Sequence, residues 1–249
     1  MIALFDSGSS YLHFGWFDNG MVSDTASIPY PDSPRKLADV VLGFLSGRAT
    51  DIAAACSVNS QWREPLFRTI DRHVPGKLHI AVEASDIDLT VQYDHPSHYG
   101  IDRALAAHAA YGFFCDSCVV IDAGTAVTVD AVAQDGSVMG GYIFPGGQTL
   151  LHGLIEKTAL PPVSIDYDST GLGTSTERCI SYGLSIGITG ALTRLIEHAA
   201  GYVSCGERVI LTGGDAESLM KVLPLHMVFR PYLVLEGLGL TAEKLPKYA

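Results

Sequence analysis

The stretch that decides the fold is CVVIDAGTAVTVDAVAQDGSVMGGYIFPGG, residues 118–147. Its three apolar runs, rich in β-branched residues, are separated by an Asp-Ala-Gly-Thr turn at 122–125 and a Gln-Asp-Gly turn at 134–136. Runs of this kind, bounded by Gly and Asp clusters, predict three short strands joined by tight turns. The amides and hydroxyl of the first turn are suited to phosphate oxygens, and its glycine lets a ligand come close. Taken alone, the turn is equally typical of a structural hairpin.

The N-terminal stretch IALFDSGSSYLHFGWFDNGMVSDTASI, residues 2–28, repeats the same plan. Five residue pairs share one offset of 116 positions: Asp6 and Asp122, Gly8 and Gly124, Ser9 and Thr125, Asn19 and Asp135, Gly20 and Gly136. A single register for all five pairs indicates an internal duplication. We therefore expect an α/β protein of two similar halves, 1–114 and 115–249, each ordered βββαβαβα, with a ligand cleft between them.

Apolar periodicity and capping residues place the remaining elements. In the first half we expect helices at 34–45, 62–72 and 101–113 and strands at 51–58 and 77–82. In the second half we expect helices at 148–157, 176–200, 215–222 and 234–244 and strands at 208–211 and 227–230. Ser175 or Thr176 is placed to cap the long helix, with Glu177 in its first turn.

Composition excludes several classes of protein. Hydrophobic residues make up 47% of the chain and charged residues 17%, which is enough apolar material for a buried core. The net charge of −11, without a run of Lys or Arg, argues against nucleic acid or an anionic membrane as a partner. No uncharged apolar stretch is long enough to span a bilayer, and no basic segment precedes the first apolar residues, so no signal peptide is expected.

Cysteine usage indicates reduced thiols. Five cysteines at irregular spacing favour a cytoplasmic location. Cys115-x-x-Cys118 precedes a strand, whereas a redox pair usually follows one, and a zinc site would need further ligands nearby. We therefore interpret this pair as structural thiols.

Asp6 and Asp122 each close an apolar run. If both pointed at one ligand, two charges about 4 Å apart would repel by roughly 4 kcal/mol at an effective dielectric near 20, so a cation would be needed between them. Magnesium prefers carboxylate, water and phosphate oxygens. Neither turn carries a Lys or Arg, so a polyphosphate there would be neutralised by cations and backbone dipoles. The alternative is that each aspartate only caps its own turn.

A second polar cluster runs from Tyr93 to Arg103. Asp102 and Arg103 lie in the first turn of an expected helix, directly after Gly100. Asp102 could be a partner of the helix dipole, or a base that accepts the proton of a hydroxyl nucleophile. Arg103 could bind an acidic substrate or orient its neighbour. His95 and His98 stand three apart without acidic or sulfur partners at matching spacing, which favours surface histidines over a metal site.

Together these motifs resemble type III pantothenate kinase, within the actin/sugar-kinase/Hsp70 superfamily of ribonuclease H-like folds. The resemblance covers nearly the whole chain and rests on Gly100-x-Asp102-Arg103, Asp122-Ala-Gly-Thr125, Gly140-Gly141-x-Ile143-x-Pro145-Gly146, Ser175-Thr176 and Thr212-Gly-Gly-Asp215. It implies ATP-dependent phosphorylation of pantothenate at its terminal hydroxyl, the first step toward coenzyme A.

The resemblance also implies the roles of individual residues. Asp102 would be the catalytic base, and Asp122 would lie beside the phosphates and their cations, which are Mg²⁺ and a monovalent cation, K⁺ or NH₄⁺. Pantothenate would be bound by Tyr93, Gly100 and Arg103, with Thr176 contributed by the other subunit of a homodimer. The ATP phosphates would be framed by Asp6, Gly8, Ser9, Gly124 and Thr125.

One departure from the family pattern concerns ATP. The first turn usually reads Asp-x-Gly-Asn-Thr or Asp-x-Gly-Asn-Ser, and here it reads Asp6-Ser7-Gly8-Ser9-Ser10. Loss of the Asn amide removes a hydrogen-bond donor, so we expect weaker ATP binding. His13 also stands where some relatives carry a basic residue.

Two alternatives to the kinase follow from these residues. The first is a catalytically impaired relative that acts as a binding or regulatory protein, which the altered Asp6 turn would favour. The second is a phosphotransferase of the same superfamily that acts on a sugar, acetate or polyphosphate. The chain leaves little room for a separate sugar domain, which speaks against this alternative.

Overall fold

The computed structural model describes residues 1–50, 52–74, 76–81, 83–169 and 171–244. The chain divides into two compact units, the first formed by Met1–Phe113 with the segment from Tyr232 onward, the second by Phe114–Pro231. Asp51 and Val82, the ends of two predicted strands, lie outside the described residues.

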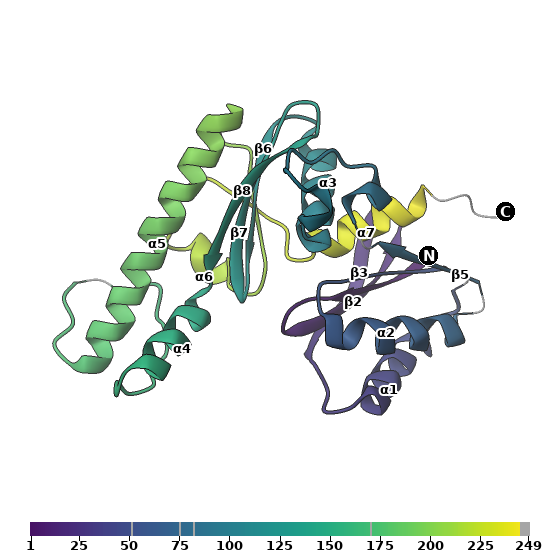
Figure 1. The fold of residues 1–249 in the computed structure, drawn as a ribbon, viewed down its shortest axis with the longest axis horizontal. Helices are drawn as coiled ribbons and strands as arrows, with labels where there is room; N and C mark the ends of the chain where they lie inside the picture. The colour runs from purple at the N-terminus through teal and green to yellow at the C-terminus, as the bar shows by residue number, and fades with distance from the viewer. Residues whose placement is uncertain (51, 75, 82, 170, 245–249) are drawn as a thin grey trace. The chain divides into compact units, whose positions relative to one another are not determined.

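The first unit is built on a five-stranded sheet (Figure 1). Its strands are β1 (Ile2–Ser7), β2 (Tyr11–Asp18), β3 (Met21–Pro29), β4 (Ile52–Ser57) and β5 (Lys77–Ala81). The spatial order is β3-β2-β1-β4-β5, with β1 antiparallel to β2 and parallel to β4. Every residue of β1 is buried, as expected for a central strand covered on both faces.

The second unit repeats this sheet. Its strands are β6 (Cys118–Ala123), β7 (Ala126–Val132), β8 (Val138–Pro145), β9 (Val209–Thr212) and β10 (Val228–Phe229). Their order, β10-β9-β6-β7-β8, matches that of the first sheet strand for strand. The prediction of a duplicated α/β fold is therefore confirmed.

Two helices cover one face of the first sheet. Helix α1 (Pro34–Leu45) begins at Ser33, whose hydroxyl accepts a hydrogen bond from the Lys36 amide. Helix α2 (Ser60–His73) begins at Asn59, whose side chain accepts from the Gln61 and Trp62 amides. Side chains of both helices share a core with alternate residues of β1, β2 and β4. Two 3₁₀ turns, η1 (Ala84–Ile87) and η2 (Pro96–His98), then lead to α3 (Ile101–Phe114).

The last helix, α7 (Leu233–Glu243), packs in the first unit, against β1, β2, β3 and β4. This differs from the expected boundary at 114/115, which placed the helix in the second half. Two glycines explain the close approach: a Cβ at Gly237 would lie 2.1 Å from the Leu105 carbonyl oxygen, and one at Gly239 would lie 2.2 Å from the Phe17 ring. The apolar periodicity of 234–244 predicts a helix but does not say which sheet it covers.

The second unit contains α4 (Gly147–Lys157), α5 (Thr176–Val203) and α6 (Ala216–Met220). The N-cap of α5 is Ser175, one of the two residues predicted for that role. The helix runs beside β6 and β7 (Figure 1). By length and composition alone, α5 is long and apolar enough to cross a membrane. The sequence had predicted no stretch of that length and composition. Core helices of water-soluble proteins pass the same test, and Ile188, Leu192 and Ile196 are buried in the core of the second sheet.

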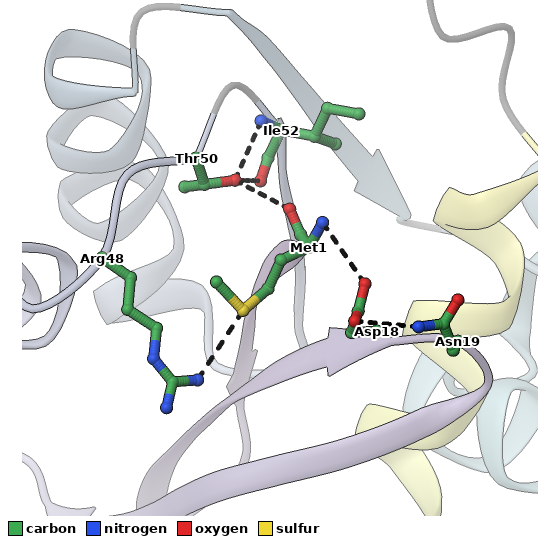
Figure 2. Close-up of polar contacts among 6 residues, drawn as sticks. All are labelled: Met1, Asp18, Asn19, Arg48, Thr50 and Ile52. Atoms are coloured by element: carbon green, nitrogen blue, oxygen red, sulfur yellow. Dashed lines mark hydrogen bonds and ion pairs between the residues drawn. The ribbon is translucent and has the colours of Figure 1, made fainter.

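Polar contacts stabilise the edge of the first sheet at which β1 begins, away from the edge where Asp6 lies (Figure 2). The Met1 ammonium lies 3.6 Å from an Asp18 carboxylate oxygen, and the Thr50 hydroxyl donates to the Met1 carbonyl at 3.0 Å. The Arg48 guanidinium approaches the Met1 sulfur at 3.7 Å and also pairs with Asp24. These contacts join the start of β1, the end of β2 and the segment leading into β4.

Candidate active site

Asp6 lies at the carboxyl end of β1 and is only 6% exposed. Its register partner on the parallel strand β4 is Cys56, whose Sγ lies 3.4 Å from Asp6 Oδ1. Burial, followed by the charge of Asp6 and then of Asp102, raises the pKa of the Cys56 thiol well above its ordinary value. The thiol is therefore protonated and donates its hydrogen to the Asp6 carboxylate.

The turn after β1 contains Gly8 and Ser9, the other two predicted phosphate ligands of the first unit. The Gly8 amide donates to the Tyr11 carbonyl at 3.0 Å, which closes the turn between β1 and β2. A Cβ at Gly8 would lie 3.3 Å from that same carbonyl oxygen. Ser9 is exposed at the tip of the turn, and its carbonyl accepts a hydrogen bond from Asn59 at 3.2 Å.

Asp102 is the second residue of α3 and is partly buried. Its Oδ1 accepts a hydrogen bond from the Arg103 amide at 2.8 Å. Burial raises the pKa of the Asp102 carboxyl above its ordinary value of 3.8, although the Arg103 amide and guanidinium act in the opposite direction. A Cβ at Gly100 would lie 2.6 Å from Asp102 Oδ1, so the position of this carboxylate depends on the glycine.

Arg103 is a buried cation held by two tyrosines. It is 7% exposed, and its Nη1 donates to the Tyr93 hydroxyl at 3.0 Å. The guanidinium carbon lies 4.5 Å from the ring centroid of Tyr99 and 5.9 Å from that of Tyr93, within the range of cation–π attraction. The three predicted substrate contacts Tyr93, Gly100 and Arg103 therefore come together around Asp102.

In the second unit, Asp122 lies near the carboxyl end of β6, and Gly124 and Thr125 form the turn to β7. The Thr125 carbonyl accepts from the Gly146 amide at 3.0 Å and from the Thr149 hydroxyl at 2.6 Å. These bonds bring the start of α4 onto the turn. A Cβ at Gly146 would lie 2.0 Å from the Gly124 carbonyl oxygen, so only glycine fits there. The positive end of a helix beside the turn favours an anion.

Tyr167 and Asp215 border the same region, and sequence analysis assigned neither to the site. The Asp215 amide donates to the Ala123 carbonyl at 2.9 Å, and the Tyr167 hydroxyl lies 3.5 Å from Asp215 Oδ2. A Cβ at Gly147, in the first turn of α4, would lie 2.2 Å from the Tyr167 hydroxyl oxygen. Burial raises the pKa of Tyr167 to about 12 and raises that of Asp215, against the lowering effect of the Tyr167 hydrogen bond.

Thr176, the first residue of α5, lines a pocket of about 770 Å³ in the second unit. Its polar lining residues are Thr174, Ser175, Thr176 and Cys179. Leucine and isoleucine side chains from α4, the following loop and α5 form the apolar part. The pocket therefore combines hydrogen-bonding groups with an apolar wall.

The carboxylates at the strand ends can serve a phosphate-bound cation. Within the described ranges, no three His, Cys, Asp or Glu side chains gather into a metal-binding group. Magnesium in phosphoryl-transfer sites is held by one or two carboxylates together with waters and substrate phosphates. Asp6 in the first unit and Asp122 in the second are each a strand-end carboxylate of the kind that such a site uses. The exposed rings of His95, directly before η2, and His98, its last residue, have centroids 5.2 Å apart.

Sequence analysis missed three residues of the first unit that contact the Asp6 turn. These are Cys56, Asn59 and Tyr30, whose hydroxyl donates to the Gly8 carbonyl at 2.7 Å. The only local signal was the position of Cys56 at the end of a buried apolar strand. The parallel register of β1 and β4 is a long-range property, and it is this register that places Cys56 beside Asp6.

Comparison with known proteins places the whole chain beside one family. The family model for type III pantothenate kinase matches residues 2–198. A type III pantothenate kinase from Persephonella marina is 35% identical over 248 residues, covering 96% of both chains. One from Halorhodospira halophila is 30% identical over 244 residues, again covering 96% of each.

Solved structures support the fold. The crystal structure of ROK hexokinase from Thermus thermophilus aligns with a TM-score of 0.55 and covers 97% of this chain and 98% of that one. Its sequence identity is 14%, so this likeness concerns the fold alone.

Proposed function

Because the chain belongs to the type III pantothenate kinase family, we propose that it phosphorylates pantothenate with ATP, giving 4′-phosphopantothenate in the first step of coenzyme A biosynthesis. The terminal hydroxyl oxygen of pantothenate attacks the γ-phosphorus of ATP, and the bond from that phosphorus to the ADP oxygen breaks. The hydroxyl proton passes to Asp102.

The observation that carries this proposal is the arrangement around the first turn of α3. A carboxylate with a raised pKa, Asp102, is adjacent to Arg103, a buried guanidinium held by Tyr93. A carboxylate with a raised pKa accepts a proton more readily, and a cation beside it can bind the carboxylate of pantothenate. Gly100 leaves room for Asp102 and, in this proposal, for the substrate.

We assign ATP to the two turns and magnesium to the phosphates. The phosphate ligands that we assign are Asp6, Gly8 and Ser9 in the first unit and Gly124 and Thr125 in the second. Asp122 would help to hold Mg²⁺ at the phosphates, and this cation would offset the negative charge that the turns cannot neutralise with Lys or Arg. A monovalent cation, K⁺ or NH₄⁺, completes the charge balance.

We further propose a cytoplasmic homodimer in which Thr176 contributes to the pantothenate pocket of the other subunit. The mixed polar and apolar lining of the pocket at Thr176 supports this, since pantothenate has hydroxyl, amide and dimethyl groups. Sedimentation combined with activity assays during dilution tests it. Specific activity should fall as dimers dissociate, and a fully active monomer would contradict the shared pocket.

The decisive experiment is a coupled ADP-release assay with ATP, Mg²⁺ and K⁺, with and without pantothenate. We expect ADP only when pantothenate is present, and none from Asp102→Asn. The matched control is Asp71→Asn, which changes an exposed aspartate on α2 and should leave turnover intact. Absence of ADP from folded wild-type protein would instead favour the binding or regulatory relative, whose one specific support is the altered Asp6 turn.

A further inference from the structure

Three successive carbonyl groups of the Asp6 turn are held by donors from other segments. The Ser7 carbonyl accepts from the Val58 amide at 3.0 Å, and the Gly8 carbonyl accepts from the Tyr30 hydroxyl at 2.7 Å. The Ser9 carbonyl accepts from Asn59 Nδ2 at 3.2 Å. The turn is therefore anchored along its carbonyl side by the end of β3 and the start of α2.

The surroundings of Tyr30 favour its hydroxyl as a hydrogen-bond donor to the turn. Its ring stacks on Trp62 of α2, with centroids 5.4 Å apart and planes 3° from parallel. Burial raises the pKa of Tyr30 to about 12, so the hydroxyl keeps its proton at neutral pH. That single proton goes to the Gly8 carbonyl, so the Ser7 hydroxyl, 2.7 Å away, is the donor to Tyr30.

Asn59 uses both ends of its side-chain amide. The oxygen caps α2 by accepting from the Gln61 amide at 3.1 Å and the Trp62 amide at 3.4 Å. This leaves the nitrogen to donate to the Ser9 carbonyl. Because the helix cap fixes the amide plane, the direction of the second bond is fixed as well.

These bonds orient the peptide planes of the turn. In a planar trans peptide the N–H points opposite to the C=O of the same unit. Tyr30, by holding the Gly8 carbonyl, sets the direction of the Ser9 amide, and Asn59 sets the plane of the next peptide. Successive backbone amides that point to one side of a turn can form an anion-binding concavity.

We propose that Tyr30 and Asn59 are positioning residues for the nucleotide phosphates, because they hold the carbonyl groups of the Asp6 turn and so orient its amides. This inference rests on the proposed function, because it takes the Asp6 turn as a phosphate-binding turn. Neither side chain need touch ATP, and both act through the backbone of the turn.

Tyr30→Phe and Asn59→Ser test the proposal separately. Phenylalanine keeps the stack on Trp62 and loses only the hydroxyl, whereas serine keeps a good cap for α2 and is too short to reach Ser9. Tyr202→Phe is the matched control, because Tyr202 is 70% exposed in the second unit. The measurements are KM for each substrate, kcat, the melting temperature, and the Kd of Mg·ATP by titration calorimetry, which does not depend on turnover.

Each variant should raise KM and Kd for ATP by about three- to tenfold, as expected for one lost hydrogen bond. The values of kcat and of KM for pantothenate should stay within about twofold. Unchanged ATP affinity in both Tyr30→Phe and Asn59→Ser would overturn the inference. Equal increases in both KM values with a lower melting temperature would overturn it as well. Wild-type protein that binds ATP but ignores pantothenate would contradict the proposed substrate, and the ATP Kd values would still decide the role of Tyr30 and Asn59.

Discussion

Cys56 Sγ lies 3.4 Å from Asp6 Oδ1, because the two residues are register partners on parallel strands at the centre of the first sheet. Both side chains are buried. The thiol thus donates a hydrogen bond to a carboxylate to which we assign a role in binding ATP.

Replacing Cys56 tests this contact. Cys56→Ala removes a donor from a buried carboxylate and should lower the free energy of unfolding by about 1–3 kcal/mol. Cys56→Ser keeps a donor and should retain more of the stability. Urea unfolding of the three proteins checks this, and an alanine variant as stable as wild type would show that the contact contributes nothing. The matched control is Cys205→Ala, which removes a buried thiol that lies in the second unit.

Asp102→Asn should separate activity from stability. Loss of the base should lower kcat by about a hundred- to ten-thousand-fold. Asparagine can still accept the Arg103 amide hydrogen bond, and it removes a carboxylate whose charge is disfavoured by burial. The melting temperature at neutral pH should therefore equal or exceed that of wild type. A clearly lower melting temperature would mean that the Asp102 charge stabilises the fold.

The pH dependence follows from the same raised pKa. Protonation of Asp102 should cause kcat to fall on the acid side at a pH above 3.8, the ordinary value for an aspartate. Between 3.8 and the raised pKa the native state binds more protons than the unfolded state. In this window the contribution of Asp102 to stability therefore grows as pH falls. Unfolding curves of wild type and Asp102→Asn across the window should show the difference, and parallel curves would refute it.

Gly100→Ala should displace the Asp102 carboxylate. The added Cβ would lie 2.6 Å from Oδ1, which requires the carboxylate to move, and a shift of about 1 Å can cost about a hundredfold in rate. The control is Gly43→Ala on α1, where a Cβ meets nothing within 4 Å. Steady-state kinetics of both variants check this, with Gly43→Ala expected to be as active as wild type. Full activity of Gly100→Ala would show that the carboxylate position is not critical.

Arg103→Lys should weaken pantothenate binding although the charge is kept. Lysine cannot reproduce a planar guanidinium that stacks on Tyr99 while donating to Tyr93. We expect KM for pantothenate to rise about tenfold or more with KM for ATP little changed. Tyr93→Phe should act in the same direction and more weakly. An equal increase in both KM values would indicate general disorder of α3 instead of a lost substrate contact.

Much of the fold was predictable from sequence. The offset of 116 positions identified two similar halves, and both sheets have the same strand order. The starts of the helices that Ser33 and Ser175 cap were predictable, because a cap and the first turn depend only on neighbouring residues. The placement of Asp102 and Arg103 in the first turn of a helix came from the same local signals. The roles assigned to these residues stay predictions.

The sequence by itself determined the elements, their duplication and the turns, because periodicity, caps and turn residues act over a few positions. Only the tertiary structure decided which sheet α7 covers, that Cys56 lies beside Asp6, and that Tyr30 and Asn59 hold the Asp6 turn. Those relationships depend on strand register and close packing between segments far apart in the chain. No local pattern encodes them, because the same strand or helix could pair or pack in several ways before the whole core is formed.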